Sequence, residues 1–237
     1  MKALSALSII LFVVCIPTLL ITTNLRLAAN EIRLYEYGFN KYDVSSDTGL
    51  DDAELRDFAG RMITYFNSDD ELFDTELFNE RELTHLKDVK GLIRLSYYLQ
   101  LASLIYIVLY VVGQFGFRRR AFWRDLAQRL VWGGGTTAAL LALFGFWAVT
   151  DFDSLFLLFH LVGFSNDLWQ LNPGDTMLLM FPQGFFNDAA LFVAAATIVE
   201  AIIIVGAAWG LPKLIRRVRT KTVVVHPNQE TEDTSAV

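Results

Sequence analysis

Two of the three histidines in this 237-residue chain lie close to long apolar runs. His85 comes shortly before one run, and His160 comes shortly after the next run along the chain. Imidazole is the side chain best suited to transfer protons near pH 7. If the two runs cross a membrane in opposite directions, both histidines lie at the same surface. Acid–base chemistry at a membrane interface is therefore the first hypothesis, and the third histidine, His226, lies in a polar terminal segment.

Each of the two histidines has a carboxylate nearby in the sequence. Asp88 is three residues after His85 and shares a helix face with it, and Asp167 follows His160. Carboxylates orient imidazoles in acid–base sites, which favours the catalytic interpretation. Aromatic residues are denser around His160 than an interfacial belt requires, so part of them is expected to line a lipid-accepting pocket. The candidates for that pocket are Phe156, Phe159, Phe164, Phe181 and Phe185.

Two other kinds of chemistry stay open from the residues alone. His85, Asp88, His160 and Asp167 could supply two nitrogens and two carboxylates to a metal, although their spacing matches no recognised signature. Ser165 could act as a nucleophile, but the residues around it lack the final glycine of a nucleophile elbow.

The composition indicates a small polytopic membrane protein. The chain is 54% hydrophobic, and its mean hydropathy is +0.38. Crossing a bilayer core takes about 20 helical residues. Four runs meet that length: Ala3–Thr23, Leu92–Val112, Trp132–Thr150 and Asp188–Leu211. The first is longer than the apolar region of a secretory signal, so it is expected to be retained as a span.

Basic residues predict the orientation of the chain in the membrane. Lysines and arginines gather between the second and third runs and after the fourth, while 151–187 contains none. The positive-inside rule then puts the basic segments in the cytoplasm and the two other connections outside. The expected organisation is transmembrane helices at 1–23, 92–113, 131–150 and 188–211, a cap at 24–91, a cytoplasmic loop at 114–130, an interfacial segment at 151–187, and a cytoplasmic tail at 212–237.

Helix signals continue through both outer segments. Asp51–Phe66 has apolar residues at helical spacing, and Asp51 or Asp52 can cap its start. Asn79 with Glu82 forms a capping-box variant, which predicts a helix that starts near Glu80 and runs into the membrane. The fold class expected is therefore an all-α membrane protein, with four transmembrane helices under a mostly helical extracytoplasmic cap.

The interfacial segment and the fourth run carry three further signals. Asp151 or Asp153 can cap a short helix that carries His160, and 172–175 reads Asn-Pro-Gly-Asp, a turn signal. Glu200 lies within the fourth run, far along the helix from both histidines. A structural hydrogen bond or a protonated acid is expected there.

Two motifs closely resemble those of the bacterial lipoprotein intramolecular transacylase family. The longer runs from Phe159-His160 through Asn166-Asp167-x-Trp169, Asn172-Pro173 and Asp175 to Phe181-Pro182-x-x-Phe185-Phe186. The shorter is Arg81-Glu82-x-x-His85-x-x-Asp88-Val89-Lys90. The resemblance implies a site between cap and membrane with two catalytic histidines, which match His85 and His160. It also implies four transmembrane helices under an extracytoplasmic cap. Together with the distribution of basic residues, this predicts location in the cytoplasmic membrane, with both termini cytoplasmic and the site on the extracytoplasmic face.

The reaction implied by this resemblance moves an acyl chain within one lipoprotein molecule. The chain leaves the sn-2 oxygen of an S-diacylglyceryl cysteine and joins the α-amino group of that cysteine, which gives a lyso-form lipoprotein. Because nucleophile and ester belong to the same substrate, no cofactor is required. The expected partners are the diacylated lipoprotein terminus, its acyl chains and the bilayer, with no nucleic acid. An oxyanion needs a donor, for which Asn166 and the Trp169 indole are candidates.

Two further function classes stay open beside this enzyme. One is a non-catalytic membrane module that binds a partner or senses lipid. The other is a metal-dependent membrane hydrolase.

Overall fold

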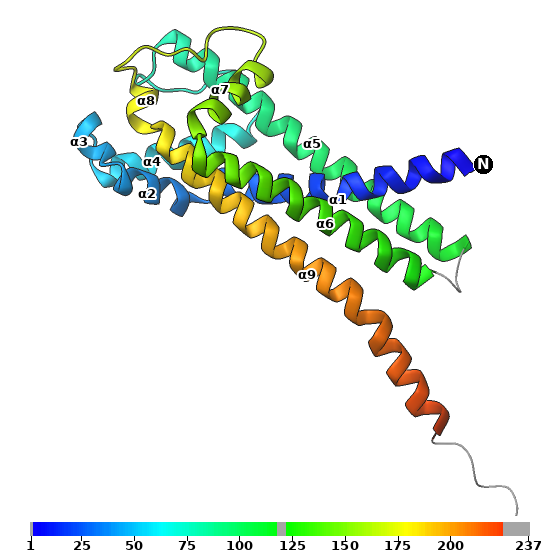
Figure 1. Cartoon of the computed structure of the whole chain (residues 1–237). Helices are drawn as coiled ribbons and strands as arrows, with labels where there is room; N and C mark the ends of the chain where they lie inside the picture. Colours follow the sequence, from blue (N-terminus) through cyan, green and yellow to red (C-terminus); the bar gives the residue numbers. More distant parts are fainter. Residues whose placement is uncertain (1, 118–121, 225–237) are drawn as a thin grey trace, which may run out of the picture.

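The structure, a computed structural model, describes residues 2–117 and 122–224, and in those ranges it contains nine α-helices and no strand (Figure 1). Four of these helices are long and apolar enough to cross a membrane. They are α1 (Lys2–Asn30), α5 (Glu80–Phe117), α6 (Phe122–Thr150) and α9 (Gln183–Val224). The expected all-α membrane fold with four spans is confirmed.

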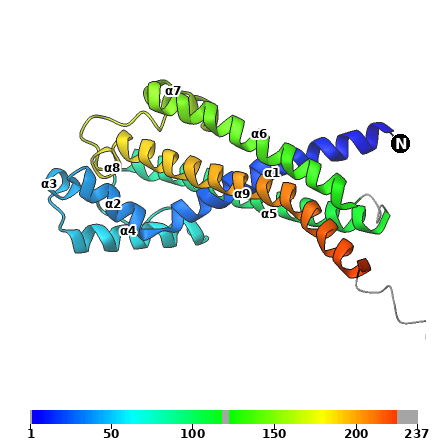
Figure 2. The ribbon, with the colours of Figure 1, turned by 60° about the horizontal axis from the view of Figure 1, so that its bottom comes forward.

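The remaining helices gather at one end of the bundle. Figures 1 and 2 show α2 (Ile32–Lys41), α3 (Val44–Thr48), α4 (Asp52–Asn67) and α8 (Thr176–Met180) together there, with α7 (Phe152–Gly163) at the same end. The first residues of α1 lie at the opposite end in both views. We call α2, α3, α4 and α8 the cap.

Local capping explains where the main helices begin. The Asp51 carboxylate accepts from the backbone N–H groups of Ala53 and Glu54. In return, the Glu54 carboxylate accepts from the backbone N–H of Asp51. The same reciprocal arrangement joins Asn79 and Glu82 at the start of α5. Both predicted helix starts are confirmed, and α5 then runs for 38 residues, about 57 Å, without interruption.

The membrane-spanning helices α5, α6 and α9 extend beyond the expected spans. The segment expected as a loop at 114–130 is mostly helical, because α5 continues to Phe117 and α6 already begins at Phe122. Helix α9 continues to Val224, well past the end of the apolar run. A helix needs no apolar residues once it leaves the bilayer, so loss of hydropathy alone does not end it.

The interfacial segment also follows its turn and capping signals. Asp151 caps α7 by accepting from the Ser154 N–H at 3.1 Å. In the turn after it, the Asp175 N–H donates to the Asn172 carbonyl at 3.0 Å, and Gly174 has a φ of 96°. That left-handed conformation favours glycine, which explains its place in the turn.

The cap has an aromatic core of its own. Helices α2 and α4 provide half of its buried residues, and the loop before α5, the first turns of α5, α8 and the start of α9 provide most of the others. Its buried aromatic residues are Tyr35, Phe39, Phe58, Tyr65, Phe66, Phe73, Phe78, Phe181 and Phe185. The cap is therefore a packed unit that holds the first turns of α5 in place.

Close packing of small residues joins the long helices. Helix α1 packs on α5, α6 and α9, and α6 packs along α9. At Gly134 of α6, an added Cβ would lie 2.7 Å from a methyl of Val205 and 3.0 Å from the Ala201 carbonyl oxygen of α9. Small residues permit this approach of helix backbones inside membranes.

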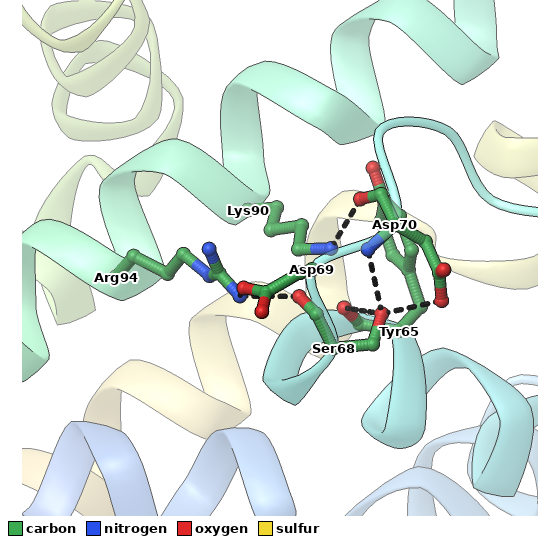
Figure 3. A network of polar contacts seen from close by, with 6 residues as sticks. All are labelled: Tyr65, Ser68, Asp69, Asp70, Lys90 and Arg94. Atoms are coloured by element: carbon green, nitrogen blue, oxygen red, sulfur yellow. Dashed lines mark hydrogen bonds and ion pairs between the residues drawn. The ribbon is translucent and has the colours of Figure 1, made fainter.

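Two basic side chains of α5 fasten it to the cap (Figure 3). Lys90 donates to the Asp70 carbonyl at 2.7 Å, and its ammonium lies 3.8 Å from the centre of the Tyr65 ring. One turn further along α5, the guanidinium of Arg94 donates to the carbonyl of Ser68. These contacts set the rotation of α5 and with it the direction of His85, which is on the same helix.

Candidate active site

His85 and His160 lie beside each other although they are far apart in the sequence. Their ring centroids are 6.1 Å apart and the ring planes are inclined by 32°. His85 belongs to the second turn of α5, and His160 to the last turn of α7. Both are buried, with 6% and 7% of the residue exposed.

Aromatic rings surround the histidine pair. Phe164 lies 5.0 Å from the His85 ring and 5.5 Å from the His160 ring, so it contacts both. Phe156 and Trp169 flank His160 at 4.3 and 5.0 Å. Phe159 packs edge-on against His160 at 5.2 Å. The imidazoles therefore lie in an apolar setting that restricts access of water.

Hydrogen bonding distinguishes the two imidazoles. Nδ1 of His160 lies 2.8 Å from the backbone carbonyl oxygen of Phe156. Because a carbonyl only accepts, this contact selects the tautomer with the proton on Nδ1 and a free lone pair on Nε2. Nδ1 of His85 is buried and makes no hydrogen bond within the described residues. An unpaired buried polar atom is costly, and at an active site it is a candidate contact for substrate.

Burial lowers the pKa of both histidines. Six charged residues precede Leu92 in α5, so His85 lies in the polar first turns of that helix, before its apolar run. Loss of solvent, reinforced by His160 and opposed by Asp88, lowers the pKa of His85 to about 4. Loss of solvent also lowers the pKa of His160, and the Phe156 carbonyl opposes it. Both imidazoles are consequently neutral near pH 7.

The predicted polar residues hold the loop after α7. The Asn166 side-chain amide donates to the Asp88 carboxylate at 2.8 Å, and its oxygen accepts from the Leu168 N–H. Asp167 is exposed, and its backbone carbonyl accepts from Arg81 at 2.6 Å. The carboxylate of Asp167 makes no hydrogen bond to His160 within the described residues; the partner of Nδ1 in that ring is the Phe156 carbonyl instead. The indole N–H of Trp169 has no hydrogen-bond partner there either, which leaves it available as a donor.

Two residues beside the pair have roles that the sequence reasoning did not assign. The sequence indicates Glu82 only as a cap, yet this residue is 1% exposed and also accepts from the Met177 N–H at 2.6 Å. Arg81 donates to the carbonyls of Asp167 and Leu168, and so joins α5 to the loop that carries Trp169. Both belong to the shorter family motif, which was the signal that could have identified them.

Two of the predicted pocket residues lie elsewhere. Phe181 and Phe185 are part of the cap core, where they pack on Tyr35, and Phe181 also packs on Phe39. The structure brings Phe156, Phe159 and Phe164 to the histidines and does not bring these two.

The other chemistries considered from the sequence gain no geometric support. Across residues 2–117 and 122–224, no group of three or more histidine, cysteine, aspartate or glutamate side chains gathers as a metal site would require. Ser165 is exposed, and nothing in the described structure joins its hydroxyl to a histidine.

Known proteins are similar to this chain in fold and in sequence. The family described as lipoprotein intramolecular transacylase Lit matches residues 10–186. The structure of the membrane integral lipoprotein intramolecular transacylase Lit from Bacillus cereus superposes with a TM-score of 0.79 at 20% identity, covering 92% of this chain and 100% of that chain. A mutant of the same Bacillus cereus protein superposes with a TM-score of 0.74 at 21% identity, covering 92% and 96%. At sequence identities of 20% and 21%, these superpositions establish the fold alone.

A sequence relative is found in Aquifex aeolicus (strain VF5). This uncharacterized protein is 30% identical over 127 residues, which cover 54% of each chain. The chain therefore aligns with about half the length of that curated relative.

Proposed function

The chain belongs to the lipoprotein intramolecular transacylase family, and on that premise we propose that it moves the sn-2 acyl chain of an S-diacylglyceryl cysteine to the amino group of the same cysteine. The product is a lyso-form lipoprotein with one amide-linked and one ester-linked chain. The observation that carries this proposal is the buried, neutral histidine pair, because acyl transfer to an amine needs proton transfer and exclusion of water.

His160 is the general base in this mechanism. Its Nδ1 is occupied by the Phe156 carbonyl, so its Nε2 has the free lone pair. Nε2 takes a proton from the substrate amino group as the nitrogen attacks the ester carbonyl carbon. A carbon–nitrogen bond forms, the bond to the sn-2 oxygen breaks, and the same proton passes to that oxygen.

His85 stabilises the negative charge that develops on the ester. A histidine with a pKa of about 4 stays neutral, and a neutral imidazole can still donate a hydrogen bond. Trp169 supplies a second donor through its indole N–H, and it lies against His160. Asn166 instead acts as a positioning residue, since its amide is bonded to Asp88.

The enzyme needs no nucleophile of its own, because amine and ester are parts of one molecule. Its task is to fold the substrate until the two groups are about 3–3.5 Å apart, where effective molarities are very large. Phe156, Phe159 and Phe164 provide an apolar surface for the moving chain and keep out water that would hydrolyse the ester.

We further propose that the cap and the histidine pair face the extracytoplasmic side. Arg118, Arg119 and Arg120 follow α5 in the sequence, and more basic residues follow residue 212. The end of α5, and the last turns of α9, in which the second basic group lies, are away from the cap, as the first residues of α1 are (Figure 1). Basic flanks of membrane helices stay in the cytoplasm, so the cap end is outside.

Reconstitution with a synthetic diacyl lipopeptide tests the reaction. Intramolecular transfer leaves the mass of the peptide unchanged, whereas hydrolysis removes one acyl chain. Fragmentation of the product must therefore show an acyl chain on the amino-terminal nitrogen at constant total mass. Loss of a chain without N-acylation would identify a hydrolase and contradict the proposal.

A further inference from the structure

A groove on the outside of the helix bundle has no part in the reaction described above. It has a volume of about 840 Å³ and is formed by α1, α5 and α9. Small-molecule sites in proteins have volumes of about 300–1,000 Å³, so the groove is large enough for a ligand. Leu101 and Leu104 of α5 and Ile203 of α9 line it and are 55%, 46% and 63% exposed. Its apolar walls are therefore open to the bilayer.

The groove and the histidine pair lie on opposite sides of α5. Leu92 of α5 faces α7. A Cβ atom added to Gly163, at the end of α7, would lie 3.3 Å from Cδ1 of Leu92. Leu101, in the groove, is nine residues further along, which is two and a half helical turns and about half a rotation. The groove is consequently separate from the catalytic site.

A positive charge lies in the groove without a carboxylate partner. The guanidinium of Arg26 stacks 4.4 Å from the centre of the Tyr97 ring and donates to the side-chain oxygen of Gln100 at 3.2 Å. No carboxylate pairs with it within the described residues. Glu200 also lines the groove, but its carboxyl group accepts from the Asn24 side-chain amide at 2.8 Å. This is the structural hydrogen bond that the sequence predicts for Glu200.

An arginine in this position calls for an anion. Arg26 is exposed and lies four residues before the end of α1, at the cap end of the span, where a long basic side chain can reach the lipid headgroups. Guanidinium is a planar, permanently charged group that suits phosphate oxygens, and anionic lipids are attracted to such groups. Because the walls around Arg26 are mainly apolar, an anion that carries acyl chains fits this groove better than a free, hydrated anion does.

We propose that this groove binds one anionic phospholipid of the surrounding membrane, with its phosphate on Arg26 and an acyl chain against Leu101, Leu104 and Ile203. Helices α5 and α9 each pack on α1 and, over their described lengths, make few direct contacts with one another. The bound lipid fills the space between them and supports α5, the helix that carries His85. This site is independent of the proposed reaction.

Native mass spectrometry of the full-length protein, titrated with phosphatidylglycerol or phosphatidylcholine, tests the proposal. The wild type should retain one phosphatidylglycerol at least about tenfold more tightly than phosphatidylcholine, as expected for a charge-assisted contact. Arg26→Gln should lose this preference, and Arg26→Lys should keep part of it. Arg33→Gln is the matched control, because Arg33 lies outside the groove beside Glu31 and should leave the preference unchanged.

A plugging variant tests the position of the acyl chain. Leu101→Trp fills the groove and should reduce the retained phosphatidylglycerol severalfold while Arg26 stays in place. Equal retention of the two lipids by the wild type would show ordinary bilayer contact only and overturn the proposal. Unchanged preference in Arg26→Gln, an equal loss in Arg33→Gln, or unchanged retention in Leu101→Trp would overturn it too.

Discussion

His85 and His160 pack with their ring centroids 6.1 Å apart, one on a membrane helix and one on the short interfacial helix α7. Neither element alone forms the pair, so the site exists only while α7 is docked on α5. Phe164, which contacts both rings, and Arg81, which holds the following loop, provide that docking. The relationship makes the site sensitive to substitutions that never touch substrate.

Replacement of Arg81 should reduce activity through the position of the loop. Arg81→Ala removes the donors to the carbonyls of Asp167 and Leu168, which leaves Trp169 less firmly held against His160. We expect lipopeptide conversion to fall by about tenfold, in line with loss of a charge-assisted hydrogen bond. Arg61→Ala is the matched control, because Arg61 bonds Asp57 and Asp74 elsewhere in the cap. Equal losses in both variants would assign the effect to cap stability instead.

Glu82 should stabilise the protein far more than its counterpart in the other capping box. Glu82 is buried and accepts from the backbone N–H groups of Asn79 and Met177, so Glu82→Ala leaves the buried Met177 N–H unpaired and also removes a partly buried capping bond. The expected cost is about 2–4 kcal/mol. Glu54→Ala removes an exposed capping bond and should cost about 0.5–1 kcal/mol. Thermal unfolding of both variants in one detergent checks the order, and similar losses would contradict the buried role of Glu82.

The stability of the protein should depend on pH through His85. Its pKa is lowered to about 4 in the folded protein, whereas an unfolded histidine has a pKa of about 6.5. As pH falls through this interval, the unfolded chain binds a proton that the folded chain does not, so stability decreases. The unfolding temperature should therefore drop less between pH 6.5 and 4 in His85→Gln than in the wild type. Equal drops would show that His85 is not the responsible group.

Topology reporters should place the cap outside the cytoplasm. A reporter fused at Asp47, in α3 of the cap, should read as extracytoplasmic, and one fused after Phe117, at the end of α5, as cytoplasmic. The basic residues that follow Phe117 are the physical reason. A cytoplasmic signal at Asp47 would move both histidines to the wrong side for a secreted lipoprotein.

Features that depend on nearby residues could be predicted from the sequence. The starts of α4 and α5 and the cap of α7 follow from side chains within three residues of each helix start. The four spans follow from apolar length alone. The proximity of His85 and His160 followed from their positions relative to two spans and from the family motifs.

Features that depend on tertiary packing could not be predicted in this way. Phe181 and Phe185 belong to the same aromatic-rich segment of the sequence as Phe156. They nevertheless pack in the cap core, because the orientation of α8 and α9 decides which rings meet. The bond from Met177 to Glu82 joins residues 95 positions apart, and no local pattern encodes it.

The most direct test is fragmentation mass spectrometry of a diacyl lipopeptide incubated with the wild type, His85→Ala, His160→Ala and the double variant. The wild type should place an acyl chain on the amino-terminal nitrogen without changing the total mass. Each single variant should fold and insert normally and lose at least about 10²-fold in rate. The double variant should be little worse than either, because groups that act as a unit are not additive. His226→Ala, a histidine outside the described residues, should react normally. Near-normal N-acylation by either single variant would contradict the two-histidine mechanism.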